Sequence, residues 1–352
     1  MKRNYIVAAA VVAALANGAA FAQMGANGPT IAQVNAAAVP GTTINIAGSS
    51  AIKTALTATI LANFCGGAAN ATIFQSTGSN TNFLGVSCVP NAATFPAGGT
   101  VNNPGSVYNI WIRYEGGSVS GYLPIVNTGF PIEEINGANV GGVSLSINGS
   151  SASNGTDDSF ASTPTNLLNR VIPDIGIGDV EPAALVNNNY PTQYTTSVWG
   201  PNAATALFGT GSSPLVDEVY ALFVNESSGF TETPLNLSTQ TIQAILNHKI
   251  TNWSNVYDVA GHQVATGSLT INIVNREQGS GSRAATDILL VGDGCGANGG
   301  TATIFNKSGA TQFFSTSNVL AAANTASAGA ITYATVDNDG SFANLTDRKS
   351  VV

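Results

Sequence analysis

A short strand, a tight turn of Gly and Ser and a helix follow one another three times in this sequence, and this order constrains the fold more than any other feature. The turns lie at residues 48–51, 116–121 and 279–282. Strands that alternate with helices predict an α/β fold, with such turns at the carboxyl ends of the strands. The length of 352 residues is enough for two lobes with separate cores.

The hydrophobic periodicity predicts the individual elements. We expect strands at 43–47, 107–114, 172–180, 219–224, 269–274 and 330–333, and helices at 51–64, 238–247, 283–290 and 317–325. The strand at 172–180 is expected to be buried and to end at Asp179. Ser238 is expected to cap its helix. The segment 136–169 is rich in Asn, Ser and Gly, which predicts an insertion or an elaborate loop.

The three turns offer hydrogen-bond donors to a negatively charged ligand. A helix N-terminus presents free N–H groups and the positive end of the helix dipole, and Ser hydroxyls add rotatable donors. Arg276 lies four residues before Ser280 of the third turn, and its planar guanidinium can hold two oxygens of a tetrahedral anion. The sequence therefore indicates an oxyanion site. Ser is also a common helix N-cap, so each turn taken alone is weak evidence for a ligand site and is compatible with a structural role.

Charged residues are scarce in this chain, and their scarcity excludes several classes of function. The 11 Lys and Arg and the 19 Asp and Glu make up 9% of the residues, with a formal net charge of −8, against about 25% in ordinary soluble domains. Because no cluster of Lys and Arg is present, we expect no nucleic-acid binding. The two His residues and the absence of P-loop, metal-site and nucleophile-elbow motifs predict no metal, no cofactor and no enzymatic activity.

The first 22 residues have the features of a secretory signal peptide. Lys2 and Arg3 precede an apolar run at 6–15, and Ala20 and Ala22 supply the small residues of a cleavage site. The run is shorter than the roughly 20 residues that cross a membrane, and no Cys that could carry a lipid lies near the site. We expect cleavage before Gln23 and a periplasmic or secreted product without membrane insertion.

Three cysteines follow, and an oxidising compartment favours a disulfide between two of them. Cys65 and Cys88 are expected to pair because they close a short loop, which leaves Cys295 without a partner. The alternative is three buried free thiols.

Five segments share their sequence and order with one known family. The segment 276–282 (REQGSGS) resembles a pattern of Arg, two residues and Gly-Ser-Gly-Thr, and 327–333 (SAGAITY) resembles Pro-Gly-Ala-Ile-Gly-Tyr. The segment 237–253 (LSTQTIQAILNHKITNW) is similar to a helix followed by His-Lys-Ile-x-x-Trp. The segments 174–179 (DIGIGD) and 46–51 (IAGSSA) are similar to the family's binding-aspartate segment and first anion turn. The chain thus resembles the phosphate-binding periplasmic proteins of ABC transporters, within the type II periplasmic-binding-protein superfamily.

The resemblance implies two α/β lobes with mixed sheets flanked by helices, joined by crossover strands, and a ligand cleft between the lobes. The first lobe would comprise residues 24–224 and 326–352, and the second lobe residues 225–325. In the family another helical segment follows the strand expected at 330–333, and the ending 347–352 (DRKSVV) is also encoded by a common sequencing adapter. We therefore expect the chain to be truncated at its C-terminus.

The resemblance also implies a set of ligand-binding residues. Ser50 would donate to the anion together with the backbone of Ala51, and either Ser118 or Ser120 would donate from the second turn. Asp179 would accept a proton from the ligand, and Arg276 would pair with two of its oxygens. The full expected set is Ser49, Ser50, Ala51, Ser118, Ser120, Asp179, Arg276, Ser280, Gly281 and Ser282.

A carboxylate in an anion site has a physical reason when the anion carries a proton. Phosphate near pH 7 is still protonated and can donate to Asp179, whereas sulfate has no proton to donate. A site built around such a hydrogen bond rejects the analogue that lacks it by roughly 10⁴-fold. The alternative is that Asp179 only terminates a strand or caps a turn.

These observations predict an exported, non-enzymatic receptor that captures inorganic phosphate, or a related oxyanion, and delivers it to an ABC permease. The alternative is a secreted surface, matrix or adhesion protein on the same scaffold, in which the low charge and the Asn- and Thr-rich loops serve packing.

Overall fold

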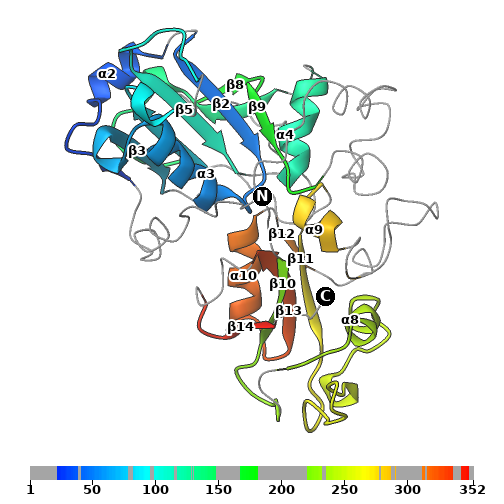
Figure 1. The fold of residues 1–352 in the computed structure, drawn as a ribbon. Helices are drawn as coiled ribbons and strands as arrows, with labels where there is room; N and C mark the ends of the chain where they lie inside the picture. Colours follow the sequence, from blue (N-terminus) through cyan, green and yellow to red (C-terminus); the bar gives the residue numbers. More distant parts are fainter. Residues whose placement is uncertain are drawn as a thin grey trace, which may run out of the picture.

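Two mixed β-sheets, each covered by helices, organise the chain into two lobes (Figure 1). The structure is a computed structural model that describes residues 22–38, 41–77, 82–95, 99–114, 117–127, 129, 131–147, 167–180, 220–231, 235–276, 279–286, 290, 311–313, 315–335 and 342–348. Residues 1–21 of the predicted signal peptide, Cys295 and the ending 349–352 lie outside the described residues. The expected α/β class with mixed sheets flanked by helices is confirmed.

The first lobe, residues 22–180, is built on a seven-stranded sheet with the order β1-β3-β4-β5-β2-β9 and with β7 beside β3. Its strands are β1 (Gln23–Met24), β2 (Thr43–Gly48), β3 (Ala71–Ser76), β4 (Phe83–Cys88), β5 (Tyr108–Arg113), β7 (Ser144–Leu145) and β9 (Ile175–Ile177). β2 runs parallel to both β5 and β9, whereas β3, β4 and β5 pair antiparallel. The parallel strands place the carboxyl ends of β2 and β9 at the same edge of the sheet.

The central strand β5 shows why this sheet is buried on both faces. All six of its residues are buried. Ile110 and Ile112 pack in the core beneath the helix that follows β2, and Trp111 packs on the opposite face with Phe74. A strand that is apolar on both faces belongs between two covering layers. The expected strand at 107–114 is thus confirmed.

The helices of this lobe are short. They are α2 (Ile31–Ala36), α3 (Lys53–Thr59), which continues as the π-helical turn η1 (Ile60–Phe64), and α4 (Gly117–Val126), with 3-10 turns at η2 (Ala68–Asn70), η3 (Ala92–Thr94) and η4 (Gly137–Asn139). The helix expected at 51–64 therefore changes to π geometry in its last turn. Pro124 lies inside α4.

The second lobe, residues 220–348, is built on a five-stranded sheet with the order β12-β11-β13-β10-β14. Its strands are β10 (Tyr220–Asn225), β11 (Asn272–Arg276), β12 (Thr311–Phe313), β13 (Ala330–Thr335) and β14 (Leu345–Arg348). Its helices are α8 (Thr239–Leu246), α9 (Gly281–Thr286) and α10 (Thr316–Thr325), with a 3-10 turn at η6 (Trp253–Asn255). Residues of α8 and α10 pack in two separate clusters, each shared with strands of the sheet. The predicted cap of α8 is confirmed, because Ser238 accepts a hydrogen bond from the Thr241 N–H.

The pairing of the last strands differs from the lobe boundaries expected from the sequence. Residues 220–224 and 330–348 were expected in the first lobe, but β10, β13 and β14 pair with one another and, through β13, with β11. All described strands from 220 onward therefore share one sheet. The periodicity of a strand indicates its conformation and not the sheet in which it finds a partner, which explains the difference.

Two further expectations need correction. The strand expected to be buried at 172–180 is the short edge strand β9, and Ile175 in it is 47% exposed. The segment expected to be an irregular insertion at 136–169 contains η4, β7 and the start of β8 (Leu168–Val171), which pairs antiparallel with β6 (Ile132–Ile135). Residues 148–166 lie outside the described part of the chain.

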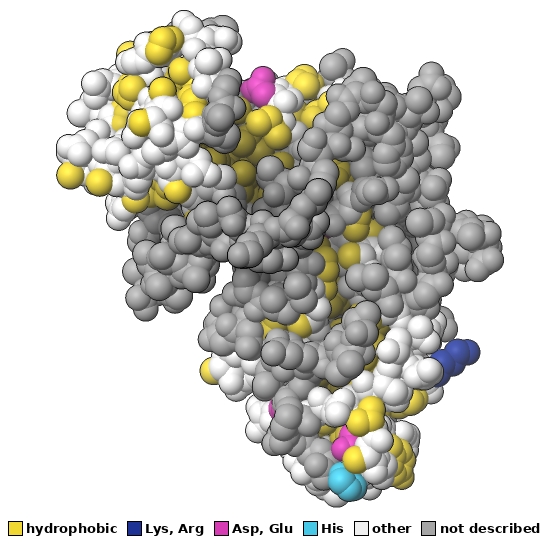
Figure 2. All heavy atoms as spheres, in the orientation of Figure 1, with side chains coloured by type: hydrophobic (Ala, Val, Ile, Leu, Met, Phe, Trp, Pro, Cys, Tyr) yellow, Lys and Arg dark blue, Asp and Glu magenta, His cyan; other side chains and the backbone are white. Residues whose placement is uncertain are grey.

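The low charge of the sequence is visible on the surface. On the face drawn in Figure 2, the described atoms are mostly uncharged, with few acidic or basic side chains among them. No described helix is long and apolar enough to cross a membrane.

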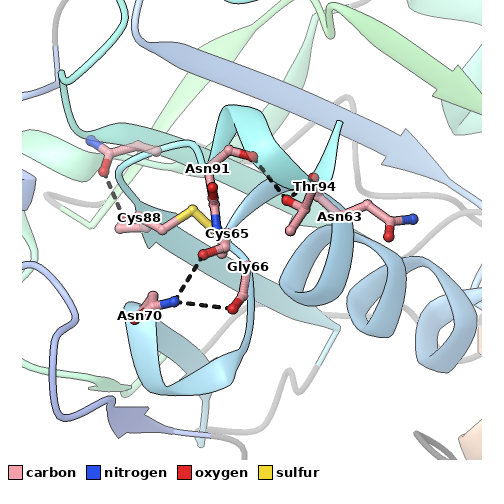
Figure 3. The surroundings of a disulfide bond; sticks show 9 residues. Asn63, Cys65, Gly66, Asn70, Cys88, Asn91 and Thr94 are labelled. Carbon is pink, nitrogen blue, oxygen red and sulfur yellow. Dashed lines mark hydrogen bonds between the residues drawn. A yellow bond between two sulfur atoms is a disulfide. The ribbon is translucent and has the colours of Figure 1, made fainter. Parts of the chain in front are cut away.

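The disulfide between Cys65 and Cys88 confirms the expected pairing. It joins the end of η1 to the last residue of β4, and both cysteines are buried. The Asn70 side chain donates to the carbonyl oxygens of Cys65 and Gly66 at 3.3 and 3.0 Å (Figure 3). The Asn91 N–H donates to the Phe64 carbonyl at 2.8 Å, so that hydrogen bonds reinforce the covalent link.

Candidate ligand-binding site

The first turn follows β2 and is packed against β9. Gly48 has a φ of 137°, and a Cβ there would overlap the carbonyl oxygen of Ile177, so this position requires glycine. The Ser49 N–H donates to the same carbonyl at 3.1 Å. The Ala51 N–H, expected to serve the ligand, donates to the Ser49 hydroxyl at 3.0 Å. In this structure the Ala51 amide thus stabilises the turn itself.

The second turn begins α4, and its two serines have different partners. Ser118 and Ser120 are both fully buried. The Ser118 hydroxyl accepts a hydrogen bond from the Asp179 N–H at 3.0 Å. The Ser120 hydroxyl donates to the Gly117 carbonyl of its own helix at 2.8 Å. Of the two serines left open by the sequence, Ser118 is therefore the one that contacts Asp179.

The third turn belongs to the second lobe and touches the second turn directly. The Val119 N–H donates to the Gly279 carbonyl at 3.1 Å. A Cβ on Gly281 would overlap the Ser118 hydroxyl and would lie 2.8 Å from the Asp179 Cβ. The absence of a side chain at Gly281 is what allows the two lobes to approach this closely.

Asp179 lies where the second and third turns meet. The Ser282 hydroxyl donates to its Oδ2 atom at 2.8 Å. Its Oδ1 atom is buried and has no hydrogen-bond partner among the described residues. Burial raises the pKa of this carboxyl, and hydrogen bonding with Ser282, the charge of Arg276 and an interaction with the Tyr220 side chain oppose that rise. Asp179 thus presents one acceptor atom, Oδ1, that no described residue uses.

Arg276 ends β11 and is 1% exposed. Its Nε donates to the Phe313 carbonyl at 3.2 Å and its Nη1 to the Thr316 hydroxyl at 3.0 Å. Its backbone N–H donates to the Asn275 side chain at 2.8 Å and to the Tyr333 hydroxyl at 3.2 Å. These bonds fix both the backbone and the guanidinium of Arg276.

Two residues at this site were missed by the sequence reasoning. Thr316 begins α10 and lies between Arg276 and Ser50, with its hydroxyl 3.0 Å from the Ser50 hydroxyl. Arg283 is buried in α9, and its Nη1 donates to the Arg276 carbonyl at 3.3 Å. A helix was expected at 317–325, directly after Thr316, but nothing in the sequence spacing connects this segment with the turn at 48–51.

All ten expected site residues are described, and hydrogen bonds or close backbone approaches connect the segments that carry them. The first turn contacts β9, Asp179 contacts the second and third turns, and Thr316 connects the first turn to Arg276. Within the described ranges no group of three or more His, Cys, Asp or Glu side chains could hold a metal ion. The arrangement presents hydroxyls, a guanidinium and one carboxylate oxygen at the junction of the lobes, a donor and acceptor set suited to a small polar ligand.

The second lobe has a known counterpart. Residues 203–351 match the family model of the PBP superfamily domain. This range, about two fifths of the chain, contains all five strands of the second sheet and Arg276 with the third turn. This part of the chain is therefore similar to the domain of the periplasmic binding protein superfamily. No curated protein matches the sequence.

The PBP superfamily match and the sheet topology agree on the extent of the second lobe. The matched range continues through β13 and β14, which the sheet pairing also assigns to this lobe. The chain passes between the sheets within residues 178–219, of which 181–219 lie outside the described residues. The two lobes of this α/β architecture are therefore the frame in which the candidate site lies.

Proposed function

We propose that this protein binds inorganic phosphate, or a related oxyanion that still carries a proton, between its two lobes and delivers it to an ABC permease. The predicted signal peptide would export the chain to the compartment in which it meets its ligand. Binding is proposed without a chemical step, because the site residues are hydroxyls, a guanidinium and a single carboxylate.

The buried Oδ1 of Asp179 carries this proposal. A buried acceptor without a partner is costly, and the cost disappears when a ligand hydroxyl donates to it. Protonated phosphate supplies such a donor, whereas sulfate would place a second acceptor against the carboxylate. Ser118 accepts a hydrogen bond from the Asp179 backbone N–H and Ser282 donates to the Asp179 Oδ2, so both the backbone and the carboxylate of Asp179 are held in place.

The other site residues provide donors for the remaining ligand oxygens. Arg276 supplies a positive charge in a buried position, where charge-assisted hydrogen bonds are strong. Ser50 and Ser280 add hydroxyls from the first and third turns. We assign Ser118 and Ser282 to positioning Asp179, since their hydroxyls form hydrogen bonds with that residue.

Calorimetric titration of the exported form with phosphate and with sulfate tests this function. We expect phosphate to bind at least about 10³-fold more tightly than sulfate, because the Asp179 carboxylate needs a ligand proton. In Asp179→Asn the side-chain amide can donate, so the preference for phosphate should collapse. Asp174→Asn, an exposed change in the same segment, is the matched control and should keep the preference.

A second pair of variants separates a receptor from a surface protein on the same scaffold. Arg276→Lys keeps the positive charge but loses the planar guanidinium that can bind two oxygens at once. We expect this variant to abolish phosphate-induced thermal stabilisation. Arg170→Lys, at an exposed position on β8, should leave that stabilisation intact. A folded wild-type protein that gives no heat with phosphate would contradict the receptor function and favour the surface protein.

A further inference from the structure

We infer that Thr316 is a positioning residue of this site, which relays a hydrogen bond from Arg276 in the second lobe to Ser50 in the first lobe and so turns the Ser50 hydroxyl hydrogen toward the ligand. The inference rests on the proposed function and deepens it. It makes the Ser50 donor dependent on contact between the lobes.

The Thr316 hydroxyl is not needed to cap its own helix. Ser315 fills that role, because its hydroxyl accepts a hydrogen bond from the Asn318 N–H at 3.2 Å. Thr316 is the first residue of α10 and is buried. Its hydroxyl is therefore available for contacts with other elements.

The chemistry of the partners sets the direction of these hydrogen bonds. The Arg276 Nη1 atom lies 3.0 Å from Thr316 Oγ1, and a guanidinium only donates, so Thr316 accepts this bond. Ser50 Oγ lies 3.0 Å from Thr316 Oγ1 and accepts the Thr316 N–H at 3.2 Å. We assign the Thr316 hydroxyl hydrogen to Ser50, which continues a chain of donors that starts at a positive charge.

This assignment decides what Ser50 can do. Its oxygen accepts from both the N–H and the hydroxyl of Thr316, and a hydroxyl has two acceptor lone pairs. The Ser50 hydrogen must then point away from Thr316, toward another acceptor. In the opposite arrangement Ser50 would donate to Thr316 and would have no hydrogen left for the anion.

The relay also connects ligand binding with lobe closure. Ser50 follows β2 of the first lobe, whereas Arg276 and Thr316 belong to β11 and α10 of the second lobe. The complete donor set exists only when these elements meet, so an anion that needs the Ser50 donor favours the closed arrangement. A ligand shifts such an equilibrium by its difference in affinity for the two states.

Thr316→Val and Thr316→Ser test the relay, because valine has the shape of threonine without the hydroxyl and serine keeps it. In phosphate titrations we expect Thr316→Val to bind at least about tenfold more weakly, the scale of one lost hydrogen bond to a charged group, and Thr316→Ser to bind like the wild type. Thr325→Val, an exposed change in the same helix, is the matched control and should bind normally.

A double-mutant cycle with Ser50→Ala distinguishes the relay from a purely structural role of Thr316, because only the relay predicts that the two losses of phosphate affinity do not add. If Thr316 acts through Ser50, Thr316→Val combined with Ser50→Ala should weaken binding no more than Ser50→Ala alone. Unchanged binding in Thr316→Val, or losses that multiply in the double variant, would overturn the relay while leaving the proposed function intact. A folded wild-type protein that does not bind phosphate would overturn both.

Discussion

At the scale of single residues, Glu134 is a buried carboxyl of the first lobe whose pKa is shifted by its surroundings. It lies in β6 and is fully buried. Its Oε1 accepts the Ile135 N–H at 2.9 Å, and its Oε2 has no partner among the described residues. Burial raises the pKa of this carboxyl to about 8, although the Ile135 N–H and the charge of Arg113 oppose the shift. Glu134 is therefore protonated in the folded protein at neutral pH.

Glu134→Gln is expected to flatten the dependence of stability on pH. The folded-state pKa lies above the ordinary value of 4.5, so the folded protein binds this proton more tightly than the unfolded chain does. The stabilisation is fully present below the ordinary value and is lost as the pH rises toward 8, with a limiting slope of about 1.4 kcal/mol per pH unit. Urea unfolding between pH 5 and 9 measures this slope for the wild type and for Glu134→Gln. Asp174→Asn is the exposed control, and equal slopes in the wild type and Glu134→Gln would contradict the expectation.

Among the elements, the short helix α9 packs closely against the first lobe because its first residue, Gly281, has no side chain. It begins at Gly281, beside Ser118 of α4. Its contact with Asp179 through Ser282 adds a hydrogen bond between the lobes. The geometry of this helix start is therefore set by the opposite lobe.

Gly281→Ala is expected to weaken phosphate binding at least tenfold and to lower the thermal stability of the ligand-free protein. The added methyl group overlaps the Ser118 hydroxyl in a contact that is already present without ligand, and this clash outweighs the better helix propensity of alanine. Titration calorimetry and thermal unfolding check the two parts of the expectation. Gly141→Ala, where a Cβ meets nothing within 4 Å, is the control. Wild-type affinity in Gly281→Ala would show that the lobes need not approach so closely.

The disulfide between Cys65 and Cys88 links η1 to β4 covalently in the first lobe. Replacing both Cys65 and Cys88 by Ala should lower the free energy of unfolding by about 2–5 kcal/mol, because the unfolded chain loses its constraint. Chemical denaturation with and without reductant measures the loss. Cys295→Ala retains the bridge and should respond to reductant as the wild type does.

At the scale of the whole molecule, several contacts between the lobes are made by the turns and residues of the candidate site. Val119 with Gly279, Asp179 with Ser282, and Ser50 with Thr316 each join an element of the first lobe to one of the second. A ligand held by these residues therefore favours the arrangement in which the lobes are in contact.

Phosphate is expected to reduce the radius of gyration of the wild-type protein in small-angle X-ray scattering, because the bound anion favours closure. The Arg276→Lys variant should show no such change, and sulfate should have little effect on either protein. A radius of gyration that does not respond to saturating phosphate would contradict the coupling of binding to lobe contact.

Much of the fold follows from local patterns. The alternation of strands and helices, the Gly and Ser turns, the cap at Ser238 and the pairing of Cys65 with Cys88 all depend on residues close in the sequence, and the structure contains them. The turns could be recognised because glycine at positive φ and serine at a helix start leave a local signature. The roles of these turns in ligand binding remain predictions.

Other features depend on residues that are far apart in the chain. Periodicity shows that a segment is a strand but not which sheet accepts its hydrogen bonds, so β13 and β14 were expected in the first lobe but pair in the second sheet, and β9 was expected to be buried but lies at an edge. The contact of Thr316 with Ser50 spans 266 positions in the sequence. The sequence by itself thus determined several of the elements, the turns and the disulfide, but not strands such as β3 and β4. Only the tertiary structure decided which elements meet, because hydrogen bonds and burial form between groups that folding brings together.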